Sequence, residues 1–241
     1  MEKAIIGKKV GMSQIFDEAG KVIPVTVIQA GPCTVVQKKT EEKDGYVAVQ
    51  LGFEEVPERK LTKPELGHSK KAGKALRILK EFKLDNAADL NVGDEINATV
   101  FAAGDRVDIT GISKGHGYQG PVKRHGGHIQ KMTHGGGPVH RHQGSMGPAT
   151  DPSRIFKGRD GAGQMGNEQV TVMNLDVVAV DEELGIIAVR GAIPGPKGGI
   201  VFVKSSAKKL AEKHVVEESG RVNPQKASAR INPQKASARN R

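Results

Sequence analysis

The chain has 241 residues and a formal net charge of +10 at pH 7. This length allows one large or two small domains with a sizeable core. The core must be aliphatic, because the chain has two Tyr, six Phe and no Trp. Its one cysteine, Cys33, excludes an internal disulfide and favours a reducing compartment. The N-terminus lacks the apolar run of a signal peptide, and no apolar run reaches the roughly 20 residues that cross a bilayer. We therefore expect a cytoplasmic protein without a membrane partner.

The first part of the chain contains short β-branched runs that are separated by turn formers. These runs cover residues 22–28, 34–36, 46–51, 95–101 and 106–110. Pro24 lacks an N–H group, so the first run is expected at a sheet edge or with a bulge. Residues 62–83 are richer in Lys, Ala and Leu, and they predict a short helical or irregular insertion.

The same β pattern returns in the last third of the chain. It covers residues 169–173, 175–180, 186–189 and 199–203. Many short strands at close spacing favour a mainly β fold with a closed or nearly closed barrel over a parallel α/β sheet. We predict a discontinuous barrel domain from residues 1–110 and 167–220, in which residues 206–219 form a short C-terminal helix.

Residues 221–241 contain two copies of a nine-residue repeat, the first starting at Arg221 and the second at Arg230. The segment has six Lys or Arg and no acidic residue. Two copies are too few for a solenoid. The composition predicts a basic, disordered tail that either contacts RNA or stays solvated.

Residues 111–166, called the extension below, interrupt the β pattern. The extension contains 15 Gly, eight Lys or Arg, six of the eight His, and only Asp151 and Asp160 as acids. Its net charge is +6, the tail contributes another +6, and the rest of the chain is left with −2. Charge concentrated in a Gly-rich segment predicts contact with a polyanion. A structureless loop of this length inside a compact domain is unusual unless it is functional.

The residue types of the extension favour RNA as that polyanion. A run of charges is usually a solvated face, but here the neighbours are Gly rather than Asp or Glu. Glycine lets backbone N–H groups approach an anion and adopts positive φ angles. Histidine offers a flat face to a base and a donor to a phosphate or 2′-hydroxyl. The extension has little apolar surface, so we predict that it takes its conformation from its partner.

Enzyme motifs in the extension lack their required context. Residues 115–120 match G-x-G-x-x-G, but Pro121 and the basic residues after it do not predict a helix, and no acid lies about 20 residues on. There is no P-loop, and Ser145 is not in a nucleophile elbow. We therefore predict no catalytic residue and no cofactor.

The cluster of His125, His128, His134, His140 and His142 invites a zinc interpretation. Against it, the spacing is irregular, Cys33 is remote, and the Gly-rich flanks offer few groups to orient the rings. We predict no metal. The alternative is a metal- or nucleotide-dependent enzyme that uses the His and Gly residues. A polyanion-binding surface protein is a third possibility, against which the absent signal peptide argues.

Five motifs resemble, in sequence and order, the bacterial type of the large-subunit ribosomal protein L3 family. The resemblance runs from about residue 5 to about residue 206. The motifs are IGKKVGMSQIF at 6–16, GISKGHGYQG at 111–120, GSMG at 144–147, RIFKGR at 154–159 and AGQMGNE at 162–168. Some members of that family carry a methylated Gln after the GSMG motif, but this chain has Pro148 there.

The resemblance implies a structural constituent of the large ribosomal subunit, with a β-barrel on the subunit surface. The extension would thread through ribosomal RNA toward the peptidyl transferase centre, with residues 122–142 deepest. Members of the family bind early in assembly and lie near ribosomal proteins of the L14 and L19 types. The chemistry of peptide transfer would belong to the RNA, so we expect neither an enzyme nor a homo-oligomer.

Residue composition and resemblance together predict the RNA contacts. The residues expected to bind ribosomal RNA are Lys8, Lys9, Lys114, His116, Lys123, Arg124, His125, His128, Lys131, His134, His140, Arg141, His142, Arg154, Lys157 and Arg159.

Overall fold

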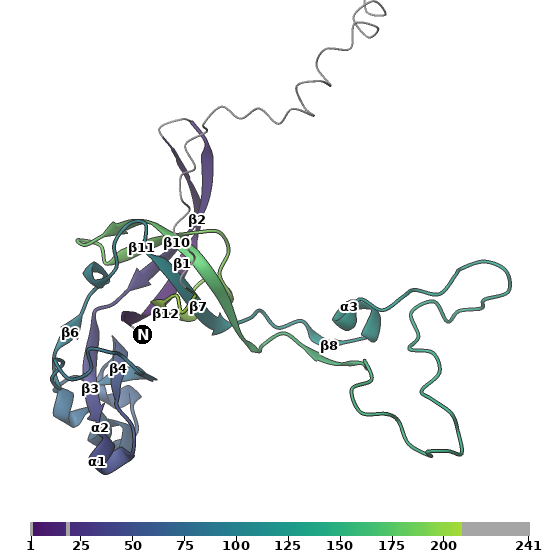
Figure 1. Ribbon diagram of the computed structural model, residues 1–241, viewed down its shortest axis with the longest axis horizontal. Coiled ribbons are helices and arrows are strands. Elements are labelled where there is room, and N and C mark those ends of the chain that lie inside the picture. The colour runs from purple at the N-terminus through teal and green to yellow at the C-terminus, as the bar shows by residue number, and fades with distance from the viewer. Residues whose placement is uncertain (1, 18–19, 209–241) are drawn as a thin grey trace, which may run out of the picture. The chain divides into compact units, whose positions relative to one another are not determined.

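The computed structural model describes residues 2–17 and 20–208. Its strands form a closed barrel, a four-stranded sheet and a two-stranded ribbon (Figure 1). The strands are β1 (Ala4–Phe16), β2 (Val22–Ala30), β3 (Cys33–Lys39), β4 (Ala48–Glu55), β5 (Leu76–Phe82), β6 (Glu95–Ile96), β7 (Arg106–Ile112), β8 (Gly117–Gln119), β9 (Gly163–Met165), β10 (Gln169–Asp181), β11 (Ile186–Arg190) and β12 (Ile200–Ser205). The helices are α1 (Glu41–Asp44), α2 (Lys63–Ser69) and α3 (Pro121–His125), with short 3-10 helices at Glu58–Lys60, Lys70–Ala72 and Ala98–Val100.

The barrel is antiparallel, in the order β1-β12-β7-β10-β11-β2, and β2 closes it by pairing with β1. Its core is aliphatic, as the composition predicts. In the interior Ile109 pairs with Val203 and Ile28 pairs with Ile187, and all four side chains are fully buried. Burial of each such side chain stabilises the fold by about 1.5–3 kcal/mol. The predicted mainly β fold with a closed barrel is therefore confirmed.

Close packing of β1 on β2 depends on a glycine. A Cβ atom at Gly7 would lie 2.6 Å from Cγ2 of Ile28 and 2.8 Å from the carbonyl oxygen of Gln29. Any larger residue would push the two strands apart at this point. Farther along β1, the register with β2 shifts between Lys9 and Gly11, which is a β-bulge.

The second sheet has the order β5-β4-β3-β6. Val35 on β3 and Leu51 on β4 are fully buried and belong to the same hydrophobic cluster as the barrel interior. The α2 helix begins with a capping box, in which the backbone N–H of Thr62 donates to the Glu65 carboxylate at 2.8 Å. Hydrogen bonds from the backbone N–H and the hydroxyl of Thr62 lower the pKa of Glu65.

Several sequence predictions of strands are confirmed, and others need correction. The runs at 22–28, 34–36 and 46–51 correspond to β2, β3 and β4. The insertion predicted over 62–83 is helical only in its first part, because residues 76–82 form β5, which pairs with β4. The strand predicted over 95–101 stops at Ile96 and continues as a 3-10 turn.

Two further corrections concern the barrel strands. The runs at 169–173 and 175–180 form one strand, β10, in which Asn174 has a φ of 57° and the register with β7 shifts. The prediction that Pro24 marks an edge holds only locally. Pro24 pairs with Gln14 of β1, but β11 pairs only with residues 25–29 of β2, and the bulge lies in β1.

Within the described residues, no helix is long and apolar enough to cross a membrane. The helix predicted over 206–219 lies outside the described residues from residue 209 onward, and the tail 221–241 lies outside them entirely.

Candidate nucleic-acid interface

The extension begins at the end of β7 and returns to the barrel through β10 (Figure 1). Its outgoing and returning legs are hydrogen bonded to each other. The N–H of Ser113 donates to the carbonyl of Glu168 at 2.9 Å, and that of His116 donates to the carbonyl of Met165 at 2.8 Å. Beyond them β8 pairs with β9. The base of the extension is thus a two-stranded ribbon held by backbone hydrogen bonds.

Gly166 allows the two legs to approach. Its φ is +70°, a conformation that L side chains rarely adopt, and a Cβ atom there would overlap the carbonyl oxygen of Lys114. No residue other than glycine fits this position without moving one leg.

A short helix, α3, follows the ribbon. Pro121 is its first residue, and Gly126 ends it with a φ of 70° while its N–H donates to the carbonyl of Pro121. The sequence-based expectation that no helix starts at Pro121 is therefore wrong. The helix spans only residues 121–125, and it directs Arg124 toward the returning leg, where its Nη1 donates to the carbonyl of Gly161 at 3.2 Å.

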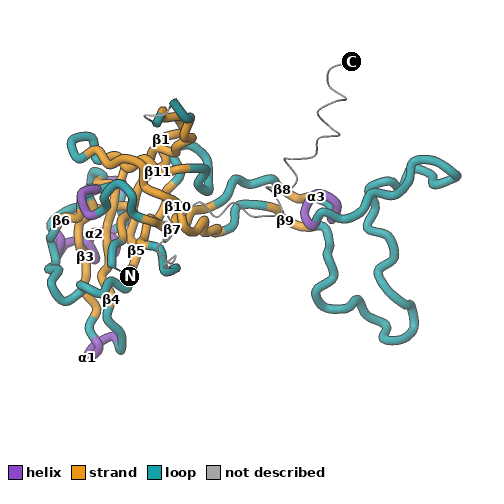
Figure 2. Tube along the Cα trace, turned by 45° about the horizontal axis from the view of Figure 1, so that its top comes forward, coloured by secondary structure: helices purple, strands orange, loops and turns teal. Residues whose placement is uncertain are grey.

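Residues 126–162 contain no strand or helix, and Figure 2 shows them entirely as loop. Their described contacts are polar. Gln143 donates from Nε2 to the carbonyl of Asp160 at 2.7 Å, and the N–H of Gln130 donates to the carbonyl of His140 at 3.1 Å. Among the described residues, no hydrophobic side chain between Ile109 and Val177 is buried. This part of the chain therefore has no core of its own.

The predicted RNA-binding residues of the extension are at its surface, with His140 half-buried. Arg159 donates to the carbonyl of Ser145, and the Arg154 guanidinium lies 5.8 Å from the centre of the Phe156 ring. His125 faces Asp160, with Nδ1 3.4 Å from a carboxylate oxygen. Nδ1 of His140 is buried and has no hydrogen-bond partner within the described structure.

The Lys and Arg side chains of the extension have no carboxylate partners. Among the described residues, none of the eight forms an ion pair. The described pairs of Lys or Arg with a carboxylate all lie outside the extension: Lys3–Asp105, Lys8–Glu54, Lys39–Glu81, Lys74–Glu95, Arg77–Glu54, Arg106–Asp176 and Arg190–Asp176.

Open cavities lie both at the base of the extension and beside α3. One, of about 440 Å³, is lined by Ser113, Lys114, His116, Arg124, His125, Met165, Gly166 and Glu168. The other, of about 290 Å³, is lined by Pro121, Val122, His125, Gly127, His128, His142, Gln143, Arg159 and Asp160. His125 lines both. Each cavity offers several N–H donors and a single carboxylate, which suits an anionic ligand.

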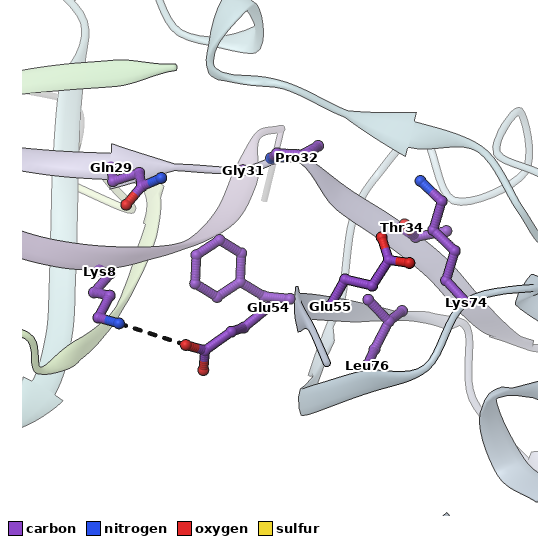
Figure 3. Close-up of a pocket in the computed structure, with 10 residues that line it drawn as sticks. Lys8, Gln29, Gly31, Pro32, Thr34, Glu54, Glu55, Lys74 and Leu76 are labelled. Atoms are coloured by element: carbon purple, nitrogen blue, oxygen red, sulfur yellow. Dashed lines mark hydrogen bonds and ion pairs between the residues drawn. The ribbon is translucent and has the colours of Figure 1, made fainter. Parts of the chain in front are cut away.

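The two remaining residues predicted to bind RNA, Lys8 and Lys9, lie on β1. Lys8 is half-buried, and its Nζ lies 3.4 Å from Oε1 of Glu54 beside a cavity of about 260 Å³ that β1 and β4 help to line (Figure 3). Lys9 is buried, with 8% of its surface exposed. Its Nζ donates to the carbonyls of Ile193 at 2.9 Å and Gly195 at 3.0 Å. The ammonium groups of both residues therefore already have protein partners.

Two exposed aromatic residues of the extension, Tyr118 and Phe156, are not among the residues predicted from the sequence to bind RNA. Tyr118 is 76% exposed and Phe156 is 54% exposed. They are the only Tyr or Phe residues between 111 and 166. Aromatic rings in a Gly-rich, basic segment are typical of single-stranded RNA binding, and this composition could have identified them.

The metal alternative lacks a set of ligands. Within residues 2–17 and 20–208, no three His, Cys, Asp or Glu side chains come together in a way that could hold an ion. The histidines at 125, 128, 134, 140 and 142 are therefore not gathered into one site.

Comparison with known families agrees with the architecture. The family model described as ribosomal protein L3 matches residues 69–185. This match starts at the end of α2 and covers β7, the whole extension and β10. It therefore includes both the segment with unpaired cations and the barrel strands that hold it. The match supports assignment of the chain to the ribosomal protein L3 family.

Proposed function

We propose that the extension is the RNA-binding element of this protein and that the barrel anchors it. Membership of the family implies a structural protein of the large ribosomal subunit that binds ribosomal RNA. The proposal adds which part of the chain makes the contact.

The unpaired cations of the extension are the observation that carries this proposal. The eight Lys and Arg side chains have no carboxylate partner among the described residues, so their positive charges repel one another. The phosphates of RNA supply the missing counter-charges, and binding releases condensed counterions. Such backbone contacts provide affinity and orientation more than sequence specificity.

We assign RNA contacts to the exposed basic and histidine side chains of the extension and to its two aromatic rings. Lys8 and Lys9 are omitted because protein groups occupy their ammonium ions. The unpartnered Nδ1 of His140 suits a hydrogen bond to RNA. The proposed residues are Lys114, His116, Tyr118, Lys123, Arg124, His125, His128, Lys131, His134, His140, Arg141, His142, Arg154, Phe156, Lys157 and Arg159.

We further propose that the barrel lies on the outside of the large subunit in the cytoplasm, while the extension reaches toward the peptidyl transferase centre. The protein would act early in assembly, beside ribosomal proteins of the L14 and L19 types. In this role it stiffens the RNA and supplies no catalytic group, which is consistent with an extension made of Gly and cationic side chains.

A salt titration tests the proposed function. The full chain is bound to purified large-subunit ribosomal RNA between 50 and 200 mM salt. If about half of the eight cations contact phosphates, the plot of log affinity against log salt should have a slope of about −3 to −4. Small-subunit ribosomal RNA serves as the competitor. Equal affinity for both RNAs would indicate a general polyanion binder and contradict the proposal.

A further inference from the structure

Lys9 is a buried lysine on a barrel strand, and protein carbonyl groups rather than a carboxylate surround its ammonium group. Its side chain donates to Ile193 and Gly195, at 2.9 and 3.0 Å. Its backbone N–H donates to the carbonyl of Gly199 at 2.8 Å, and its carbonyl accepts from the N–H of Gly198 at 2.7 Å. One residue of β1 therefore holds both halves of the loop between β11 and β12, residues 191–199.

The same loop lies against the start of the extension. Gly195 has a φ of +92°, and a Cβ atom there would lie 2.8 Å from the carbonyl oxygen of Ile112. A Cβ atom at Gly111 would lie 3.5 Å from Cβ of Pro194. The loop thus contacts the last two residues of β7, immediately before the hydrogen-bonded legs begin.

Burial of the Lys9 ammonium group removes hydration, and hydrogen bonds to protein groups must compensate for this loss. Burial lowers the pKa of Lys9, and the positive charge of Lys114 lowers it further. Lys114 is the first cation of the extension. The carbonyl groups of Ile193 and Gly195 compensate for part of the lost hydration, because an ammonium group can donate three hydrogen bonds. An apolar side chain would leave these two carbonyls without their donor.

We infer that Lys9 is a positioning residue, which fastens the loop 191–199 over the end of β7 and thereby fixes the direction in which the extension leaves the barrel. This inference rests on the proposed function of the extension. Lys9 itself does not contact RNA in this account. Its role is to present the cations of the extension in one arrangement, so that RNA binding loses less conformational freedom.

Hydrogen exchange on the free full-length chain tests the fastening. Lys9→Met keeps the length of the side chain and removes its donors, whereas Lys204→Met removes one charge from a half-exposed position on β12. We expect faster amide exchange at residues 111–116 and 191–199 in Lys9→Met, with the other barrel amides unchanged. Lys204→Met should exchange like the wild type. Unchanged exchange at both segments in Lys9→Met would overturn the inference.

Binding to large-subunit ribosomal RNA tests the consequence. Residues that act through packing without touching the ligand change coupling by about 2- to 30-fold, which is the loss of affinity we expect for Lys9→Met. Lys204→Met should bind like the wild type. Equal losses of affinity in both variants would mean that Lys9 contributes only its positive charge to RNA binding. Faster exchange in Lys9→Met without any loss of affinity would mean that the attachment of the loop does not affect RNA binding. Either result would overturn the inference.

Gly195→Ala tests the same contact from the side of the loop, with Lys9 intact, and carries the test if Lys9→Met does not fold. We expect the same two effects, because the added methyl group pushes the loop away from Ile112. If the wild-type chain fails to bind the RNA, the proposed function fails. The exchange experiment contains no RNA and still decides whether Lys9 fastens the loop.

Discussion

The barrel and the extension use positively charged side chains in opposite ways. In the barrel and the sheet beside it, cations such as Lys3 and Arg106 have carboxylate partners. In the extension, none of the Lys and Arg residues has such a partner within the described structure. The barrel also buries a continuous aliphatic core, while the extension buries no hydrophobic side chain. We therefore expect the extension to obtain both counter-charges and order from a partner.

Removing the extension should have the largest effect. Residues 121–160 are replaced by Asn-Gly, which suits a tight turn between the paired strands β8 and β9. We expect the barrel to fold with little change in Tm, because its core contains no residue of the deleted segment. Tight, salt-sensitive binding to large-subunit ribosomal RNA should be lost. A deletion variant that binds the RNA as well as the full chain would show that the barrel is the binding element.

A core substitution should affect only the barrel. Ile109 is fully buried, so Ile109→Ala should lower the free energy of unfolding by about 2–5 kcal/mol, measured in urea. Ile155 in the extension is 52% exposed, and Ile155→Ala should change the stability by less than about 0.5 kcal/mol. Similar losses for both substitutions would mean that the extension packs into a core.

Neutralising cations should change the salt dependence of RNA affinity when the cations are in the extension, but not when they are in the barrel or the sheet beside it. Lys123, Arg141 and Lys157 are changed to Gln together, and the control changes Lys3, Lys39 and Lys74 to Gln. If the first three each contact a phosphate, the slope of log affinity against log salt should shrink by about 2 to 2.7. The control should leave the slope unchanged and cause a small loss of stability, because carboxylates pair with these ammonium groups. Hydrogen bonds to Tyr46 and then Glu81 raise the pKa of Lys39, and the bond to Glu95 raises the pKa of Lys74. The comparison fails if both triple variants change the slope equally.

A substitution at Gly166 should disturb both the pairing of the two legs of the extension and RNA binding. Gly166→Ala forces a Cβ atom onto the carbonyl of Lys114 at a φ of +70°, which costs about 1–3 kcal/mol of local strain. We expect faster exchange at the amides of Ser113 and His116 and weaker RNA binding. Gly120→Ala is the matched control, because its φ is −72° and nothing lies within 4 Å of the added atom. Identical exchange in the two variants would mean that the legs do not depend on Gly166.

The sequence predicts the barrel well where strands are β-branched and bounded by turns, as in β2 and β11. It does not reveal β1, in which Gly7, Lys8, Lys9 and Gly11 interrupt the apolar pattern. Packing explains Gly7, since β2 leaves no room for a side chain at this position. The strand β5 is missed because Arg77, Lys80 and Lys83 in and beside it suggest a helical or irregular segment.

Composition predicts the exposure of the candidate site residues only where the chain has no tertiary packing. In the extension, cations such as Lys123 and Arg141 are exposed, as the Gly-rich sequence suggests. On β1 the two adjacent lysines look equivalent, yet Lys8 faces Glu54 and Lys9 points to buried carbonyls. Adjacent residues of a strand point to opposite faces, and the contacts on each face come from residues far away in the sequence.

Hydrogen exchange of the extension with and without RNA decides whether the extension takes its order from RNA. In the free chain, the amides of residues 126–162 should exchange almost unprotected, while those of β7 in the barrel are protected. Addition of large-subunit ribosomal RNA should slow exchange across residues 126–162 and leave β7 unchanged. Strong protection of these residues in the free chain, unaltered by RNA, would contradict the claim that the extension takes its order from its partner.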